Sequence, residues 1–255
     1  MRRSFSYPAL AAASAVLLLG VSGFAPAPQD ASAYAEVLAS SDRLAADRAR
    51  DEGRRAAETL AFAQVRAGQK VADMIIGGGY FTRIFAAAVG EEGSVVAWQP
   101  AEFIAFQASY GEILTTVDEA YENVSALRSP IGAPEFPQGL DLVFTAQNYH
   151  DLHLAPFADD TAARVNAAVF AALKPGGLYV IVDHSALAGA GLGVADSLHR
   201  IDIADVRREV EAAGFVLEAE SDILARPDDP RTANVFDADI RGQTDQFMLR
   251  FRKPA

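Results

Sequence analysis

The feature that most constrains the fold is a glycine triplet placed directly after an apolar stretch. The segment VADMIIGGGYFTRIF covers residues 71–85, with glycines at 77–79. Glycine loses much conformational freedom on folding, so a cluster indicates backbone with positive φ or a close approach to a ligand. The stretch therefore predicts a buried strand, a tight turn and a helix that begins at once, with Asp73 in the strand and Thr82 in the first helical turn.

Downstream of the triplet, segments typical of strands and helices alternate to the end of the chain. After the first strand, KVADMII, strands are predicted at SVVAWQ, ENVSAL, LDLVFTA, LYVIVDH, GFVLEAES and TDQFMLRFRK, and helices at Tyr80–Val89, from Ala101 to about Tyr110, Asp160–Leu173 and Ile203–Ala213. This alternation is typical of a parallel sheet with helices on both faces. The last two strands lack an intervening helix and are expected to form an antiparallel hairpin. We therefore predict an α/β fold, a Rossmann-like doubly wound sheet of seven strands, mostly parallel, with a C-terminal antiparallel hairpin.

The amino terminus has the order of a secretory signal. Arg2 and Arg3 precede an apolar run, Ala9–Ala25, and Ala31-Ser32-Ala33 is a small-x-small cleavage site before Tyr34. An uncleaved membrane anchor is the alternative, but the run is shorter than the roughly 20 residues that a span needs. RRSF also resembles a twin-arginine export signal. We expect residues 1–33 to be a cleaved signal peptide, and the mature protein to be periplasmic without a stable membrane span.

The mature chain is expected to consist of a short helical segment followed by one domain. Residues 34–62 place apolar side chains on one face between alternating charges, which predicts a helix whose charges face solvent. Residues 63–255 hold the alternating strands and helices. A chain of 255 residues with 51% apolar residues can bury one sizeable core.

Composition excludes several kinds of function. The net charge of −12 argues against a nucleic-acid partner. The absence of cysteine excludes disulfides, thiolate metal sites and cysteine nucleophiles. In the segment HDLH, His150 and His153 have a spacing that two metal ligands could use, but the sequence offers no third partner beside them. We therefore expect no metal site.

Polar residues follow several of the predicted strands at one edge of the sheet. In such sheets ligands bind beyond the carboxyl ends of the strands, where strand order reverses. The glycine turn there exposes backbone N–H groups at a helix N-terminus, which suits a carboxylate or a phosphate. Gln99, the segment 147–151 and the pair Asp183-His184 are expected on the same edge. A dinucleotide is disfavoured, because Thr82 stands where a third glycine is needed and Gln99 where an acid is needed.

Taken together and in this order, five motifs resemble the class I S-adenosylmethionine-dependent methyltransferases. They are VADMIIGGGYFT, LDLVFTAQNYHDLH, LKPGGLYVIVDH, LHRID followed by EVEAAGF, and IRGQTDQFMLRFRKP, and the resemblance extends from about Leu60 to the C-terminus. Within the family the chain is most similar to a bacterial branch of predicted, often exported methyltransferases with a glycine triplet. The usual first motif is D-x-G-x-G-x-G, where Ile75 replaces the first glycine. Gln99 replaces the usual ribose-binding acid, and a neutral amide makes weaker hydrogen bonds than a carboxylate.

The resemblance implies S-adenosylmethionine as cofactor and a methyl acceptor that we expect to be a small molecule. The implied cofactor contacts are Asp73, Gly77, Gly78, Gly79, Tyr80, Thr82, Gln99, Gln147 and Asn148, with the Tyr80 ring facing the sulfonium. The sequence predicts no particular oligomeric state.

Methyl transfer needs an aligned acceptor and, for some acceptors, a base. His150 is the first candidate for that base because imidazole titrates near neutral pH; Tyr149 and His184 are the next. Asp151, His153 and Asp183 are further candidates, and His199-Arg200 is either structural or faces the substrate. The alternative functions are a catalytically silent binding domain with the same fold in the cell envelope, and a nicotinamide oxidoreductase.

Overall fold

The computed structural model describes residues 29–41 and 43–255, so most of the predicted signal peptide lies outside the described residues. One seven-stranded sheet has the order β3-β2-β1-β4-β5-β7-β6. Its strands are β1 (Lys70–Met74), β2 (Ser94–Trp98), β3 (Val124–Leu127), β4 (Leu140–Ala146), β5 (Leu173–His184), β6 (Val216–Ser221) and β7 (Gln246–Arg252). β7 pairs antiparallel with both β5 and β6, and the other pairs are parallel. The predicted fold class is confirmed.

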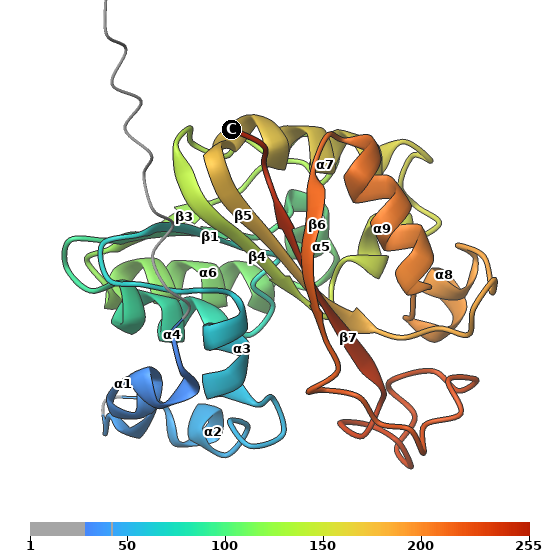
Figure 1. The fold of residues 1–255 in the computed structure, drawn as a ribbon, viewed down its shortest axis with the longest axis horizontal. Helices are drawn as coiled ribbons and strands as arrows, with labels where there is room; N and C mark the ends of the chain where they lie inside the picture. The colour runs from blue at the N-terminus through green and yellow to red at the C-terminus, as the bar shows by residue number, and fades with distance from the viewer. Residues whose placement is uncertain (1–28, 42) are drawn as a thin grey trace, which may run out of the picture.

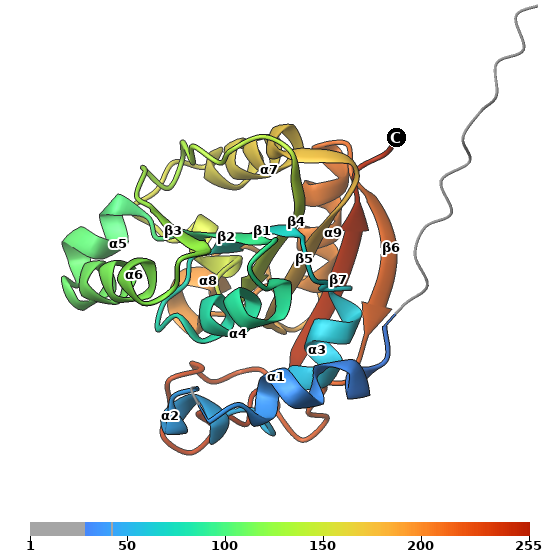
Figure 2. The same ribbon diagram turned by 90° about the vertical axis from the view of Figure 1, so that its left-hand side faces the viewer.

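Helices cover both faces of the sheet. They are α4 (Tyr80–Val89), α5 (Ala101–Phe106), α6 (Ser109–Ala120), α7 (Thr161–Ala172), α8 (Val194–Leu198) and α9 (Ile203–Ala212), together with the short 3-10 helix η2 (His150–His153). One core lies between the sheet and α4, and a second lies between the sheet and the pair α7 and α9. Figure 1 and Figure 2 show α4 on one side of the sheet and α7 on the other. No helix among the described residues is long and apolar enough to cross a membrane.

The helix predicted from Ala101 to about Tyr110 is wrong in its extent. The structure breaks it at Gln107, whose backbone is extended, and starts α6 at Ser109. Gly111, just beyond the predicted end of that helix, lies within α6. There it permits close packing with α5, because a Cβ at Gly111 would lie 3.0 Å from Cγ2 of Ile104.

The single helix predicted for residues 34–62 is also wrong. The segment forms η1 (Ala31–Tyr34), α1 (Ala35–Ala39), α2 (Ala45–Arg48) and α3 (Ala56–Phe62). Figure 2 shows α1, α2 and α3 on the same side of the sheet as α4. Several of its charges pair within the protein instead of facing solvent. Buried Asp47 accepts from Arg83 of α4 at 2.6 Å, and buried Arg43 pairs with Asp51. The Asp47–Arg83 pair ties the segment to the domain, and the Arg43–Asp51 pair joins two parts of the segment itself.

Candidate active site

A cavity of 1110 Å³ opens at the carboxyl edge of the sheet, beside β1 and β4, where the strand order reverses. This is where parallel sheets of this kind bind ligands. Two of its walls differ in chemistry. The glycine wall is formed by Ile75, Ile76, Gly77, Gly78 and Tyr80, and the histidine wall by His150, Asp151, His184 and His199.

The three glycines do not share one role. Gly77 and Gly78 line the cavity, and a Cβ added at either would meet no atom within 4 Å, so bare backbone faces the open space. Gly79 lies behind them as the N-cap of α4 with a φ of 71°. A Cβ at Gly79 would lie 2.8 Å from Nη1 of Arg83 and 3.1 Å from Cγ1 of Val117. Gly79 therefore allows the backbone turn and the close packing at the start of α4. Of the three glycines predicted to contact a cofactor, Gly77 and Gly78 are the two that line the cavity.

Ile75 holds a backbone conformation that a β-branched residue rarely adopts. Its φ is 62°, at the position where the family motif has glycine. The conformation is held by hydrogen bonds from the Ile75 N–H to the Trp98 carbonyl (2.9 Å) and from Asn148 Nδ2 to the Ile75 carbonyl (2.8 Å). Such strain costs on the order of 1–3 kcal/mol and concentrates at ligand-binding sites.

Asp73 lies at the base of the glycine wall and lines the cavity. Burial raises the pKa of its carboxyl to about 6, although the Thr82 hydroxyl donates to its Oδ2 at 2.6 Å. Thr82 itself is fully buried and outside the cavity lining. The structure gives Thr82 another role than the predicted cofactor contact: it holds Asp73 in place from the first turn of α4.

Gln99 does not reach the cavity. Its side chain is fully buried, and Oε1 accepts a hydrogen bond from the Gly77 N–H at 3.0 Å. Instead of facing the space where a ribose was expected, the Gln99 side chain supports the glycine turn from within the protein. Glu102 of α5 supplies a carboxylate to the cavity instead, three residues further on, with Oε2 also accepting from the Ile131 N–H.

Three arginines that the sequence did not single out also line the cavity: Arg50, Arg54 and Arg164. Arg54 comes from the segment before α3, and its Nη2 donates to Gln147 Oε1 at 3.1 Å. Burial, together with the nearby charge of Arg50, lowers the pKa of Arg54 to about 10. Among the described residues, no carboxylate lies within ion-pair distance of Arg54. A mostly buried cation without a paired carboxylate therefore stands beside the glycine wall.

Tyr80 lines the cavity, but its ring and hydroxyl already have protein partners. The Arg54 guanidinium lies over the ring, 4.7 Å from its centroid, and that of Arg50 lies at 5.1 Å. The hydroxyl donates to Asp51 at 2.7 Å. The cation that the ring faces here is an arginine of the N-terminal segment, not the sulfonium suggested by the sequence.

The loop after β4 brings two predicted amides to the cavity. Gln147 has a φ of 66°, and its Nε2 donates to Gln246 Oε1 at 3.1 Å. The amide nitrogen of Asn148 donates to the carbonyls of Ile75 and Ala146, which joins the ends of β1 and β4. Both residues line the cavity, as the predicted cofactor contacts require.

His150 is the centre of the histidine wall. Its Nδ1 lies 2.8 Å from Oδ1 of Asp183, a fully buried carboxylate at the end of β5, and its Nε2 lies 3.3 Å from Oδ1 of Asp151. Burial alone would lower the pKa of His150, but Asp183 and Asp151 together raise it to about 9. The raised pKa favours the imidazolium form at neutral pH, so His150 can act as a base, or offer a lone pair at Nε2, only after it loses one proton.

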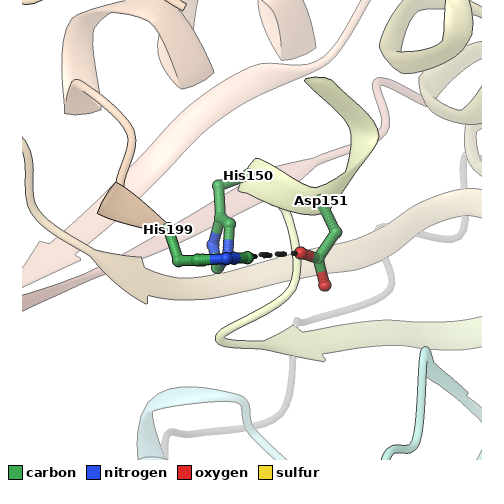
Figure 3. A group of neighbouring side chains, drawn as sticks. All are labelled: His150, Asp151 and His199. Atoms are coloured by element: carbon green, nitrogen blue, oxygen red, sulfur yellow. Dashed lines mark ion pairs between the residues drawn. The ribbon is translucent and has the colours of Figure 1, made fainter. Parts of the chain in front are cut away.

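His199 reaches the same cluster from a distant part of the chain. It follows α8 with a φ of 53°, and its Nδ1 lies 3.9 Å from Oδ1 of Asp151. Figure 3 shows the His150, Asp151 and His199 side chains converging from η2 and from the end of α8. The next residue, Arg200, is fully buried and pairs with Asp229 at 2.7 Å. Of the pair His199-Arg200, the arginine is structural and the histidine faces the cavity.

Tyr149 is not a catalytic candidate in this structure. Its side chain is fully buried outside the cavity, where its hydroxyl donates to Glu209 at 3.0 Å and accepts from Asn166 at 2.8 Å. His153 also points to Glu209, at 3.1 Å. Because successive residues of η2 point in different directions, the segment sends His150 and Asp151 into the cavity and Tyr149 and His153 toward α9.

His184 does line the cavity, as predicted. Burial lowers the pKa of its imidazole to about 4, and its Nδ1 lies 2.8 Å from the Thr244 hydroxyl. It is therefore neutral over the physiological range.

No family model and no curated protein matches this chain. Solved structures do. A SAM-dependent methyltransferase from Aquifex aeolicus is 17% identical, with a TM-score of 0.55 over 80% of this chain and 93% of that one. A candidate methyltransferase from Bacillus halodurans is 21% identical, with a TM-score of 0.52 over 78% and 98%. The cyclase SpnF is 14% identical, with a TM-score of 0.56 over 80% and 81%. The chain therefore has the Rossmann-like fold of the class I methyltransferases.

Proposed function

We propose that the protein is an S-adenosylmethionine-dependent methyltransferase with a small-molecule acceptor. The observation that carries this proposal is the bare backbone of Gly77 and Gly78 on a 1110 Å³ cavity at the carboxyl edge of the sheet. Ligand cavities commonly measure about 300–1,000 Å³, so this one has room for a cofactor and a small acceptor side by side. The methyltransferase fold of the neighbours supports the same conclusion.

The two walls suggest where each ligand binds. We place the cofactor on the glycine wall, with its carboxylate beside Arg54 and its ribose near Glu102, which takes the role expected of Gln99. Asn148 and Gln147 would position it from the β4 side. The acceptor would then lie against the histidine wall. Since the sulfonium is already activated, the chain's main task is to hold the acceptor in line with the methyl group.

Titration calorimetry with S-adenosylmethionine, its demethylated product and NAD tests this proposal. We expect micromolar binding of the first two ligands and none of NAD. Gly78→Leu should abolish the heat of binding, because the side chain enters the space that the cofactor needs. Gly193→Leu is the matched control: a Cβ at Gly193 also meets no atom within 4 Å, but the residue lies outside the cavity lining.

Arg54→Met should separate the carboxylate contact from simple cavity filling. Removing one charged hydrogen-bond donor costs about 1.5–3 kcal/mol, so we expect binding of the demethylated product to weaken roughly 10- to 100-fold. Equal affinity in wild type and Arg54→Met would place the carboxylate elsewhere.

A catalytically silent binding domain is the second candidate function. It is favoured by Gln99, whose side-chain oxygen is engaged by Gly77, and by Ile75 in place of a glycine. The cyclase SpnF has a similar fold, and one fold can host different functions. No heat with either form of the cofactor at millimolar concentration would favour this candidate over the enzyme.

We also propose that the mature protein begins near Tyr34 and acts in the periplasm, after export that a twin-arginine signal could direct. The support is the order of Arg2-Arg3, the apolar run and the Ala31-Ser32-Ala33 site. N-terminal sequencing of protein from fractionated cells measures this directly. An intact Met1 in the cytoplasmic fraction would contradict it.

A further inference from the structure

We propose that His150, Asp151 and His199 form a binding site for a divalent transition metal on the histidine wall. Each residue offers one ligand atom, and the three atoms lie within 4.8 Å of one another. Two imidazoles and one carboxylate are a ligand set typical of zinc and of non-haem iron(II). Figure 3 shows the three side chains converging on a common point. The sequence predicted no metal because HDLH lacks a third partner, and His199 supplies that partner from a distant loop.

The distances suit a metal with little movement of the protein. Ligands about 2.0–2.1 Å from a tetrahedral ion lie about 3.3 Å from each other. His150 Nε2 and Asp151 Oδ1 are 3.3 Å apart, and His199 Nδ1 and Asp151 Oδ1 are 3.9 Å apart. Only the His199 ring needs to move inward, and its side chain is a quarter exposed.

Asp183 gives His150 the support that metal-binding histidines usually have. Its Oδ1 lies 2.8 Å from His150 Nδ1, and its Oδ2 accepts from the His150 backbone N–H at 2.7 Å. A carboxylate on one ring nitrogen orients the ring and directs the lone pair of the other nitrogen, here Nε2, toward the metal. Asp183 is fully buried, so it acts as a positioning residue for His150 and not as a ligand.

His199 is also held in place for this role. Its left-handed backbone is uncommon for a residue other than glycine, and such strain concentrates at binding sites. The adjacent Arg200 anchors it through Asp229 and the carbonyls of Ser185 and Ala233. The third ligand is therefore fixed by the loop between β6 and β7, which contributes Asp229 and Ala233.

All three ligands line the cavity, so an ion held by them would keep coordination positions open to it. Such an ion could bind an oxygen or nitrogen of the acceptor and favour its deprotonated form. This role rests on the proposed function, but metal binding itself does not.

Metal binding is tested on tag-free, EDTA-treated protein without S-adenosylmethionine, using Zn²⁺ for affinity and Co²⁺ for its visible absorption. We expect one Zn²⁺ per chain with micromolar or tighter affinity, and a Co²⁺ spectrum typical of nitrogen and oxygen ligands. Mg²⁺ should not compete, because two imidazoles suit it poorly.

Three variants and one control make the assignment specific. His199→Asn tolerates the left-handed backbone and should weaken Zn²⁺ binding about 10-fold or more, as should Asp151→Asn. Asp183→Asn should weaken it about 10- to 100-fold, as loss of a partner behind a ligand does elsewhere. His153→Gln is the matched control in the same 3-10 helix and should bind like wild type.

Equal Zn²⁺ affinity in wild type and His199→Asn, or no Co²⁺ absorption in a protein that is folded by circular dichroism, would overturn the site. The two proposals fail separately. Zn²⁺ binding without any heat from S-adenosylmethionine would retain the metal site and remove the methyltransferase, and the reverse result would do the opposite.

Discussion

The glycine wall and the histidine wall of one cavity are built in different ways. The glycine wall is backbone and mostly apolar side chains from one continuous stretch, residues 75–80, and it depends on local conformation. The histidine wall is made of titratable side chains from η2, from the end of β5 and from the end of α8. The comparison indicates that changes on the first wall act through shape and backbone strain, whereas changes on the second act through charge.

The largest effect is expected from His150 on the histidine wall. His150→Ala should lower turnover roughly 10²- to 10⁴-fold with little change in cofactor affinity, because His150 contacts the acceptor side of the cavity and not the glycine wall. A screen that detects the demethylated cofactor would first identify the acceptor.

Two further variants distinguish the loss of a functional side chain from a loss of folding. His150→Asn keeps a side-chain donor for buried Asp183 while removing Nε2, and it should be as inactive as His150→Ala. His153→Ala changes a histidine of the same 3-10 helix outside the cavity and should keep most of the turnover. Full activity in His150→Asn would show that the histidine wall does not act in the chemistry.

The two walls also differ in how far sequence alone could predict them. The strand, the turn and α4 are neighbours along the chain, so the pattern around Asp73 and the glycine triplet located the glycine wall and the fold around it. Behind that wall, the directions of single side chains could not be predicted: Gln99 and Thr82 turn into the protein, where they bond to the Gly77 N–H and the Asp73 carboxylate.

The histidine wall required tertiary structure. His150 and His184 follow strands and could be placed at the sheet edge, but His199 comes from a distant part of the chain. The same is true of Arg54, which lies beside the glycine wall. The charges of residues 34–62 suggested a solvated helix because pairing between Asp47 and Arg83 leaves no signal in either local pattern. The burial of Tyr149 outside the cavity could not be foreseen, because the path of the chain through η2, and not the residue type, decides which neighbour faces the cavity.

The second prediction concerns the pH dependence of stability and uses Asp73, the buried carboxyl group at the base of the glycine wall. Burial raises the pKa of Asp73 from 3.8 to about 6, so the folded protein binds this proton more tightly than the unfolded chain. The resulting stabilisation is fully present below pH 3.8 and is lost as the pH rises to about 6. Two pKa units correspond to about 3 kcal/mol in the free energy of unfolding.

Asp73→Asn removes this titration while Thr82 can still donate to the amide oxygen. Urea unfolding at pH 4, 5, 6 and 7 should show the variant gaining stability relative to wild type as the pH rises through this range. Parallel curves for the two proteins would mean that Asp73 has an ordinary pKa.

The third prediction separates the glycines of the triplet. Gly79→Ala should lower the free energy of unfolding by about 2 kcal/mol, because φ is 71° and the new Cβ would press on Arg83 and Val117. Gly78→Ala should change it by less than about 0.5 kcal/mol, since its Cβ enters open space. Chemical denaturation of both variants measures the difference, and equal losses would contradict the division of roles.

The smallest expected effect is a difference in stability between two variants at Ile75, which measures the backbone strain at this residue. Ile75→Ala and Ile75→Gly both remove a buried branched side chain, but only alanine keeps a Cβ at a φ of 62°. A left-handed L-residue costs about 1–2 kcal/mol, which exceeds the roughly 0.5–1 kcal/mol by which glycine is usually worse than alanine. The glycine variant should therefore be more stable than the alanine variant by about 0.5–1 kcal/mol in urea unfolding. At buried Ile76, where φ is negative, the same pair of substitutions should follow the usual order, with alanine more stable. If alanine were the better residue at both positions, the glycine wall would carry no backbone strain at Ile75, and the departure from the family motif there would be a matter of side-chain packing alone.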